Sequence, residues 1–423
     1  MLQVFLPATI CNTRTLWPSE MNLYNDTVSI ESLLPENATA SNSKKGFLLS
    51  GDPREVFTLG AGHIAINVNL SGKGHIFIQY LEALKKRGVQ ITLILVNDKA
   101  PVGLDTRNAP KDYQNPYFYL MDFSASNGDW QRYNFERIVE DYSKYVDNWV
   151  LGNEINSQLY GYYGPASVEE YTKKFCETFE VAYNMIKESN ENANVYFSFD
   201  QGWDLPELDS KNKKFNKILS QYRYNAKEQL FYINKYLDKK IDWGVSIHPY
   251  PAPVESAKFW DDVGAGYDIN STDIRERPYL LTLKNLEIIV PFLADKRYLK
   301  RDGNVRNIII TEFALTSHDG ERIQAAGLYY LWEKIKDNPF IKAFLYNSQT
   351  DLPDGYHFGL TSDKNKKRLI WAVFKDMDRE NENGWCKDLL DSVLEEQGYF
   401  SAKGVLFKTA SVSEADRAIL LQQ

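Results

Sequence analysis

The sequence predicts an α/β protein whose core is a parallel (β/α)8 barrel (a TIM barrel), and three observations support this fold class. Short apolar runs rich in β-branched residues alternate with longer segments whose apolar residues recur at helical spacing. Counted from Phe47, there are eight such runs. Polar or acidic residues follow several of them, and the carboxyl ends of barrel strands are where enzymes of this fold carry their active sites.

Each expected strand is a short apolar run that a turn or a helical segment follows. Strands of a parallel barrel are buried on both faces, so they are continuous apolar runs rather than alternating ones. In chain order the expected strands are residues 45–50, 63–70, 89–96, 149–154, 195–200, 243–247, 307–312 and 343–346. Eight parallel strands are the number that closes a barrel of this class.

The segments between the runs carry helix signals. Residues 76–87 repeat apolar side chains at helical spacing and end before Gly88, which is a helix stop signal. Ser167 followed by Glu169 and Glu170 is typical of a helix N-terminus, because the hydroxyl caps backbone N–H groups and the acids face the positive end of the helix dipole. We expect that helix to end near residue 189, and further helices at residues 52–59, 135–146, 219–236 and 279–293.

The chain divides into three parts. Residues 1–45 are polar and interrupted by prolines, and they predict an irregular N-terminal extension or the remnant of another module. Residues 46–380 form the expected catalytic barrel, and residues 381–423 a C-terminal helical tail packed on it. Two long connections, residues 97–130 and 252–306, are expected to rise over the barrel mouth, because βα loops emerge at the carboxyl ends of the strands.

Composition and charge argue against some classes of function. The net charge is −8, whereas binding to nucleic acid or to an anionic membrane needs a basic patch. Aromatic residues make up 14% of the chain, and their faces stack on sugar rings, although core packing explains many of them equally well. The three cysteines, Cys11, Cys176 and Cys386, are far apart, so neither a disulfide framework nor a zinc site is expected.

The sequence gives only a default expectation for localisation. No apolar run approaches the roughly 18 to 20 residues of a membrane span, and the start of the chain lacks the basic residues and long apolar core of a signal peptide. We therefore expect a cytoplasmic protein by default, or a secreted one if the N-terminus has been trimmed. No cofactor is expected, and the oligomeric state is left open.

Two glutamates stand out because each ends an apolar run. Glu154 closes the segment Trp149-Val150-Leu151-Gly152-Asn153-Glu154, and Glu312 closes Ile308-Ile309-Ile310-Thr311-Glu312. A carboxylate inside such a core would be costly to ionise. At the carboxyl end of a barrel strand it can face a pocket instead. We therefore expect Glu154 and Glu312 to converge as a catalytic pair, against the alternative that both are rim residues held in salt bridges.

Three motifs together resemble those of a known group of enzymes. Asn153-Glu154 ends strand four, His248-Pro249-Tyr250 ends strand six, and Glu312 ends strand seven, a pattern similar to that of clan A glycoside hydrolases, which are retaining glycosidases on a (β/α)8 barrel. The resemblance covers roughly residues 45–375. Within the clan, the segments KKGFLLS, LGAGHIAINVNL and FGLTSDKNKKR make the chain most similar to a bacterial group labelled only as a domain of unknown function.

The resemblance implies roles for individual residues. Glu154 would be the general acid/base, Glu312 the nucleophile, and Asn153 the group that hydrogen-bonds the sugar 2-hydroxyl. Glycosidic cleavage needs one carboxyl that stays protonated and another that stays ionised, about 5 to 5.5 Å apart in retaining enzymes. His248 and Tyr250 could point into the same mouth and hold Glu312 ionised, with a purely structural histidine as the alternative.

The chain departs from the clan pattern at two strand ends. Many members place an Arg near the end of strand two and a Trp at the end of strand eight, whereas this chain has Asn67 and Asn69 at the first and Asn347 near the second. Trp203 or Tyr250 could supply the missing stacking platform. The remaining residues expected to contact sugar, all at strand ends, are Asn69, Asn97, Asp200, Trp203, Asn347 and Gln349.

We therefore expect a retaining glycoside hydrolase that cleaves O-glycosidic bonds of an oligo- or polysaccharide by double displacement. A non-catalytic carbohydrate-binding barrel is the main alternative, and it could tolerate loss of either glutamate. A metal-dependent hydrolase usually needs several His and Asp ligands at strand ends. The chain has only 5 histidines, of which His248 alone ends an expected strand, so no metal is expected. The sugar, the linkage and endo or exo action are left open.

Overall fold

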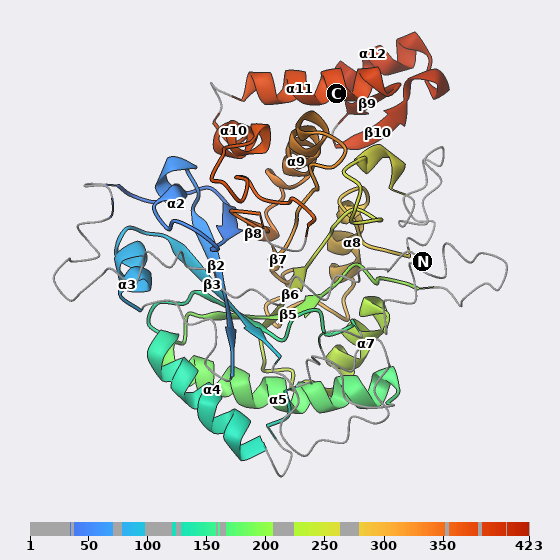
Figure 1. The fold of residues 1–423 in the computed structure, drawn as a ribbon. Coiled ribbons are helices and arrows are strands. Elements are labelled where there is room, and N and C mark those ends of the chain that lie inside the picture. Colours follow the sequence, from blue (N-terminus) through green and yellow to red (C-terminus); the bar gives the residue numbers. More distant parts are fainter. Residues whose placement is uncertain are drawn as a thin grey trace, which may run out of the picture.

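The computed structural model contains a closed barrel of eight parallel strands, β1 to β8, which confirms the predicted fold class (Figure 1). The structure describes residues 34, 38–70, 78–97, 121–123, 128–157, 160, 166–205, 224–262, 279–351, 355–379, 383–402 and 404–422. Each strand pairs in parallel with the next one in the chain. β1 also pairs with β8, which closes the barrel.

All eight strands lie where the apolar runs predict them. They are β1 Lys45–Leu48, β2 His63–Asn69, β3 Gln90–Val96, β4 Asn148–Leu151, β5 Asn194–Phe199, β6 Trp243–Ile247, β7 Ile308–Ile310 and β8 Ile341–Tyr346. The fourth and seventh expected runs overshoot at their carboxyl ends, because the chain leaves the sheet three residues before Glu154 and two residues before Glu312. Both glutamates therefore stand on the first residues beyond their strands.

Helices surround the barrel, as Figure 1 shows. They are α2 Glu55–Thr58, α3 Ile78–Lys86, α4 Gly128–Tyr142, α5 Val168–Ser189, α7 Ala226–Tyr236, α8 Ile289–Leu293, α9 Glu321–Ile335 and α10 Leu369–Asp376. The predicted start of α5 is confirmed in detail, because Ser167 and Glu170 form a reciprocal capping box. α4 begins at Gly128, before the expected Phe135, and of the expected helix 219–236 the first residues lie outside the part of the chain that the structure describes.

The predicted helix over residues 279–293 is wrong for its first half. Residues 279–285 form no helix, and the rest of the segment forms a 3-10 turn, Leu286–Ile288, followed by the short α8. The Asn285 side chain accepts a hydrogen bond from the N–H of Thr282 (2.8 Å) and donates one to the carbonyl of Leu280 (2.8 Å). Such local bonds offer the backbone an alternative to the helix.

The C-terminal tail is not purely helical, contrary to expectation. α11 Gly384–Glu396 is followed by an antiparallel hairpin of β9 Tyr399–Ala402 and β10 Val405–Lys408, then a 3-10 turn, Thr409–Ser411, and α12 Glu414–Gln422. Gly398 and Gly404 have positive φ (77° and 73°), which favours glycine at the two ends of β9. The tail lies against α9, where the Tyr330 hydroxyl donates to the Gly404 carbonyl (2.8 Å) (Figure 1).

The barrel interior has an apolar layer beneath a polar one. The inward apolar side chains form a cluster separate from the larger core between barrel and helices: Leu48, Ala65, Ile94, Val96, Val150, Tyr196, Ile309, Ala343 and Leu345. Side chains two positions apart share a face of a strand. Ser198, Thr311 and Asn347 therefore follow Tyr196, Ile309 and Leu345 on the inward side and form a polar layer at the carboxyl ends.

The two long connections are described only in part. Of residues 97–130, positions 98–120 and 124–127 lie outside the described residues, as do positions 263–278 of residues 252–306. Leu281 donates its N–H to the Gln201 carbonyl (2.7 Å), and Trp203 donates to the Tyr279 carbonyl (3.0 Å). This part of the second connection therefore lies at the carboxyl end of the barrel, beside the residues that follow β5. Among the described helices, none has the length and apolar character needed to cross a membrane.

Candidate active site

Glu154 stands on a tight turn that directly follows β4. Gly152 and Glu154 both have left-handed backbone conformations, with φ of 76° and 47°. For a residue other than glycine this conformation is uncommon and is often found at functional sites. The Gly152 N–H donates to the Leu95 carbonyl (2.9 Å), and the Ser157 N–H donates back to the Glu154 carbonyl (2.8 Å). The turn aims the Glu154 side chain at the barrel mouth instead of continuing the sheet.

Glu312 is held by two uncharged hydrogen-bond donors. Its Oε2 accepts from the Tyr250 hydroxyl (3.1 Å) and from Asn347 Nδ2 (3.4 Å). Asn347 Nδ2 also donates to the Tyr250 hydroxyl oxygen (2.9 Å), so the two supporting side chains brace each other. The side chain of Glu312 is 3% exposed and that of Glu154 is 14% exposed.

The imidazole of His248 lies between the two carboxyl groups. Its Nδ1 is 2.8 Å from Glu154 Oε1 and 3.9 Å from Glu312 Oε2, and its Nε2 is 2.9 Å from Thr311 Oγ1. One carboxyl oxygen of each glutamate and an imidazole nitrogen lie within 4.8 Å of one another. The two carboxyl groups therefore converge at the carboxyl end of the barrel.

The surroundings give the two glutamates different proton affinities. Burial raises the pKa of Glu154 to about 8. Burial also raises the pKa of Glu312, whereas the hydrogen bonds from Tyr250 and Asn347 oppose that shift by favouring the carboxylate. Burial lowers the pKa of His248 and raises that of Tyr250, so the imidazole is neutral and the phenol stays protonated. The raised pKa of Glu154 favours its protonated form near neutral pH, whereas the two donors around Glu312 favour its carboxylate form.

Several of the expected site residues gather around this pair. His248, Tyr250 and Asn347 contact the glutamates directly. Asn153 is 2% exposed and immediately precedes Glu154 in the turn. Asp200 is 7% exposed, and the charge of Glu154 contributes to a raised pKa of its carboxyl group. Asn69 ends β2 on the same face as Ala65, which points into the barrel.

Three expected sugar contacts are engaged elsewhere. Asn97 uses its amide to hold loops, because its Nδ2 donates to the Tyr160 carbonyl and its Oδ1 accepts from the Met121 N–H. The Trp203 ring is 5% exposed and packs edge-on against Phe292 at 5.0 Å. Gln349 donates its Nε2 to the Asp52 carbonyl (2.8 Å). All three lie near strand ends, but loop packing directs their side chains.

Sequence reasoning missed three polar residues that support the pair. Ser198 Oγ accepts from the Glu154 N–H (3.3 Å), and Thr311 Oγ1 bonds to His248. Both positions lie inside expected strands, so inward alternation from Tyr196 and Ile309 could have found them. Asn156 bonds to Asp200, and it follows a turn whose shape the sequence did not reveal.

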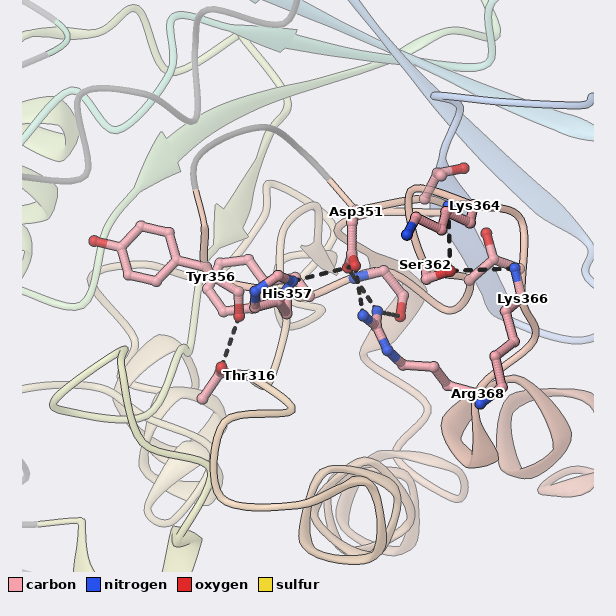
Figure 2. A network of polar contacts seen from close by, with 12 residues as sticks. Thr316, Asp351, Tyr356, His357, Ser362, Lys364, Lys366 and Arg368 are labelled. Atoms are coloured by element: carbon pink, nitrogen blue, oxygen red, sulfur yellow. Dashed lines mark hydrogen bonds and ion pairs between the residues drawn. The ribbon is translucent and has the colours of Figure 1, made fainter.

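The loop after β8 contacts the side of the site that holds Glu312. Figure 2 shows Asp351 and Arg368 joined by two hydrogen bonds (2.6 and 2.5 Å), with Asp351 also accepting from the Gly359 N–H. The pair ties the start of the loop to its end. Phe358, inside the loop, packs on the Tyr250 ring at 6.2 Å. The Asp351–Arg368 pair therefore helps to fix Tyr250, which donates to Glu312.

The side chains of Glu154, His248 and Glu312 are also chemically capable of binding a metal ion. In the part of the chain that the structure describes, Glu154, His248 and Glu312 form the one group of three possible ligands. Carboxylate and imidazole donors suit a divalent ion such as zinc. Ligands must be deprotonated to bind it, whereas burial here raises the pKa of both carboxyl groups.

Comparison with models of known protein families gives a match. A model described as "Family of unknown function (DUF5722)" matches residues 75–394. No curated protein matches the sequence. The predicted resemblance to a group without an assigned function is thereby confirmed.

Three glycosidases are among the solved structures to which the chain is similar. A family 39 glycoside hydrolase from the gut symbiont Bacteroides cellulosilyticus WH2 has a TM-score of 0.50 and 16% identity, covering 83% of this chain and 66% of that chain. The β-glycosidase of Thermosphaera aggregans has a TM-score of 0.49 and 15% identity, covering 79% and 85%. A β-galactosidase from the haloarchaeon Halorubrum lacusprofundi has a TM-score of 0.47 and 14% identity, covering 79% and 57%. The first likeness shows a shared fold, and the chain spans just under two thirds of that enzyme's length.

The turn before Glu154 should not accept a side chain at Gly152. A Cβ there would lie 2.9 Å from Ile155 Cγ2 and 3.1 Å from Phe175 Cζ, in addition to the cost of the left-handed backbone. We expect Gly152→Ala to lower the free energy of unfolding by about 3 kcal/mol or more in urea titrations. Gly303→Ala is the matched control, because Gly303 has φ of 82° and open space around it, so only about 1 kcal/mol is expected. Equal losses would contradict the packing argument.

Burial of Glu154 should make stability depend on pH. Because its pKa is raised from 4.5 to about 8 in the folded state, folded protein holds this proton more tightly than unfolded protein. The stabilisation is complete below pH 4.5 and is lost as the pH rises toward 8. We expect the melting temperature of Glu154→Gln to rise relative to wild type between pH 5 and pH 8.5. Glu188→Gln, on the exposed side of α5, should track the wild type, and parallel curves for all three proteins would contradict the prediction.

Proposed function

We propose that this chain, which belongs to the DUF5722 family of unknown function, is a retaining glycoside hydrolase that cleaves O-glycosidic bonds of an oligo- or polysaccharide. One observation carries the proposal: two carboxyl groups, just after β4 and β7, converge, and burial raises the pKa of Glu154 to about 8 while two hydrogen-bond donors face Glu312. Two carboxyl groups with separated pKa values are what glycosidic cleavage by double displacement requires.

In the first step, the Glu312 carboxylate attacks the anomeric carbon while Glu154 donates its proton to the departing glycosidic oxygen. The bond between that carbon and the leaving oxygen breaks, and a bond to a Glu312 oxygen forms. In the second step, Glu154, now a carboxylate, accepts a proton from water as the water attacks the same carbon and releases Glu312. Two inversions give net retention.

The neutral imidazole of His248 suits a partner that changes its protonation state. When Glu154 is protonated, its hydroxyl donates to Nδ1 and the Nε2–H donates to Thr311. When Glu154 is a carboxylate, Nδ1–H donates to it and the Thr311 hydroxyl donates to Nε2. The Oγ1 of Thr311 can exchange roles because it also bonds to the Ser246 hydroxyl. Both protonation states of Glu154 thus find a hydrogen-bonded partner.

The departure from the clan pattern at the nucleophile has a counterpart in this chain. Tyr250 and Asn347 donate to Glu312, where an arginine would stand in many clan members. Two neutral donors favour the carboxylate less than a cation does, but among the described residues Glu154 has no such donors on its carboxyl group apart from His248. Asn153, by its resemblance to the clan residue, would contact the sugar 2-hydroxyl.

Mutants of the two glutamates should differ in kind. We expect Glu312→Ala to abolish turnover of every substrate, because no other group supplies the nucleophile. Glu154→Ala should lose about 10²- to 10⁴-fold on glycosides with poor leaving groups and much less on dinitrophenyl glycosides, whose departure needs little protonation. Azide should then accelerate the second step in Glu154→Ala by attacking the trapped intermediate. Turnover of aryl glycosides and of plant, algal and host polysaccharides is the measurement.

Three further outcomes decide between this proposal and its alternatives. Proton NMR of the first-formed sugar should show the retained anomer, and an inverted anomer or azide rescue of Glu312→Ala would overturn the assigned roles. Activity should survive EDTA, whereas its loss and recovery with a divalent ion would favour a metal-assisted hydrolase. Sugar binding without turnover on any substrate, unchanged in both mutants, would indicate a non-catalytic carbohydrate-binding barrel.

A further inference from the structure

We propose that Asn156 and Asp200 are positioning residues that hold the left-handed turn of Glu154 in place, so that its carboxyl group can deliver a proton to the leaving group. The inference rests on the proposed function and deepens it. It concerns how the acid is aimed, and it arises from contacts between the residues after β4 and those after β5.

Asn156 and Asp200 bind each other at two points. The Asn156 Nδ2 donates to Asp200 Oδ1 (2.5 Å), and the Asp200 N–H donates back to Asn156 Oδ1 (2.8 Å). Two bonds in opposite directions fix both the distance and the relative orientation of the two backbone segments. Asn156 is fully buried and Asp200 is 7% exposed, so water does not compete strongly for these bonds.

The pair is anchored to a larger framework. Asp200 Oδ1 also accepts from the Gly202 N–H (2.8 Å), and Asn156 Nδ2 also donates to the Gly202 carbonyl (3.1 Å). The neighbouring Gln201 carbonyl accepts from Leu281 of the connection after β6. Residues 200–202, which follow β5, are therefore held by Asn156 on one side and by Leu281 on the other. We call this segment the platform.

The turn needs such a platform because it lies outside the sheet. β4 ends at Leu151, and the residues that follow are not part of a helix or strand. Two bonds to Ser198 hold the middle of the turn, one from the Glu154 N–H to Oγ (3.3 Å) and one from the Ile155 N–H to the carbonyl (2.9 Å). Asn156 fixes its far end. Glu154, with φ of 47°, is thus held from both sides.

Asp200 acts in this arrangement through hydrogen-bond geometry. Burial and the nearby charge of Glu154 raise the pKa of the Asp200 carboxyl well above its ordinary value. Its Oδ1 accepts from Asn156 and Gly202 whether or not the group is ionised. The amide oxygen of an asparagine could accept the same two bonds at nearly the same place. This suggests a conservative replacement that keeps the geometry and removes the carboxyl group.

The test compares variants on two leaving groups. We expect Asn156→Ala and Asp200→Ala to lower kcat/KM by roughly 10- to 100-fold for methoxyphenyl glycosides, because acid catalysis depends on placement within about 1 Å. The same variants should lose less than about threefold on dinitrophenyl glycosides, whose leaving group needs little protonation. KM should change little, because the polar groups of both side chains bond to each other and to Gly202. Asp200→Asn should stay within about threefold of wild type on both substrates.

A matched control separates positioning from general stability. Asn190 donates its Nδ2 to the Ser143 carbonyl (3.0 Å) at the far end of α5, so Asn190→Ala removes a comparable amide bridge away from the site. It should leave the leaving-group dependence unchanged. Melting temperatures identify any variant that fails to fold. Asp200→Asn against Asp200→Ala still tests the proposal if Asn156→Ala does not fold.

The outcomes are distinct from those that test the proposed function. Equal losses on both leaving groups would show a merely structural role and overturn the inference. A loss in Asp200→Asn as large as in Asp200→Ala would show that the carboxyl group itself is needed, and would overturn it too. Absence of glycoside turnover in the wild type would instead overturn the proposed function, before any variant is compared.

Discussion

Two carboxyl groups buried within a few ångströms of each other are the constraint on which the rest of the site depends. Ionising both would place two uncompensated charges in a region from which most water is excluded, at a cost of several kcal/mol. The chain avoids this by giving the groups unequal surroundings. Hydrogen-bond donors cluster on Glu312, while burial keeps a proton on Glu154. The neutral His248 between them adds no charge that would need further compensation.

The layered barrel interior makes this arrangement possible. A layer of aliphatic and aromatic side chains, such as Val150, Tyr196 and Ile309, fills the lower barrel. Ser198, Thr311 and Asn347 stand above it and offer hydroxyl and amide groups on three different strands. Because strands of a closed barrel cannot shift register singly, these groups keep their mutual distances. The polar layer is thus preorganised by the apolar one beneath it.

The strands and the convergence of Glu154 and Glu312 could be predicted because both follow from local pattern. A strand buried on both faces is a continuous apolar run. A glutamate that ends such a run either faces the barrel mouth or is buried at a cost in free energy when it ionises. Other strand-end residues were less predictable. Asn97 and Trp203 also follow strands, yet contacts with residues of the loops hold their side chains. Those contacts come from segments far away in the sequence, and spacing along the chain carries no information about them.

Elements outside the barrel show the same limit. The expected helix over residues 279–293 has the right apolar spacing, but the side chain of Asn285 competes for backbone groups and the segment bonds to the residues after β5. In the tail, a hairpin interrupts the expected helices, and β9 lies next to α11. Propensity decides structure only where tertiary partners do not offer the backbone better bonds.

Burial raises the pKa of both glutamates, and the groups that the structure describes around Glu312 carry no positive charge that would reverse this shift. In the described part of the chain, the side chains that hydrogen-bond this carboxyl group are a phenol and an amide, both neutral. A nearby cation would draw negative charge into the site and lower the pKa of both carboxyl groups. With neutral donors, the site tolerates one negative charge and resists a second. Glu154 then keeps its proton because its ionisation would place a second negative charge beside that of Glu312.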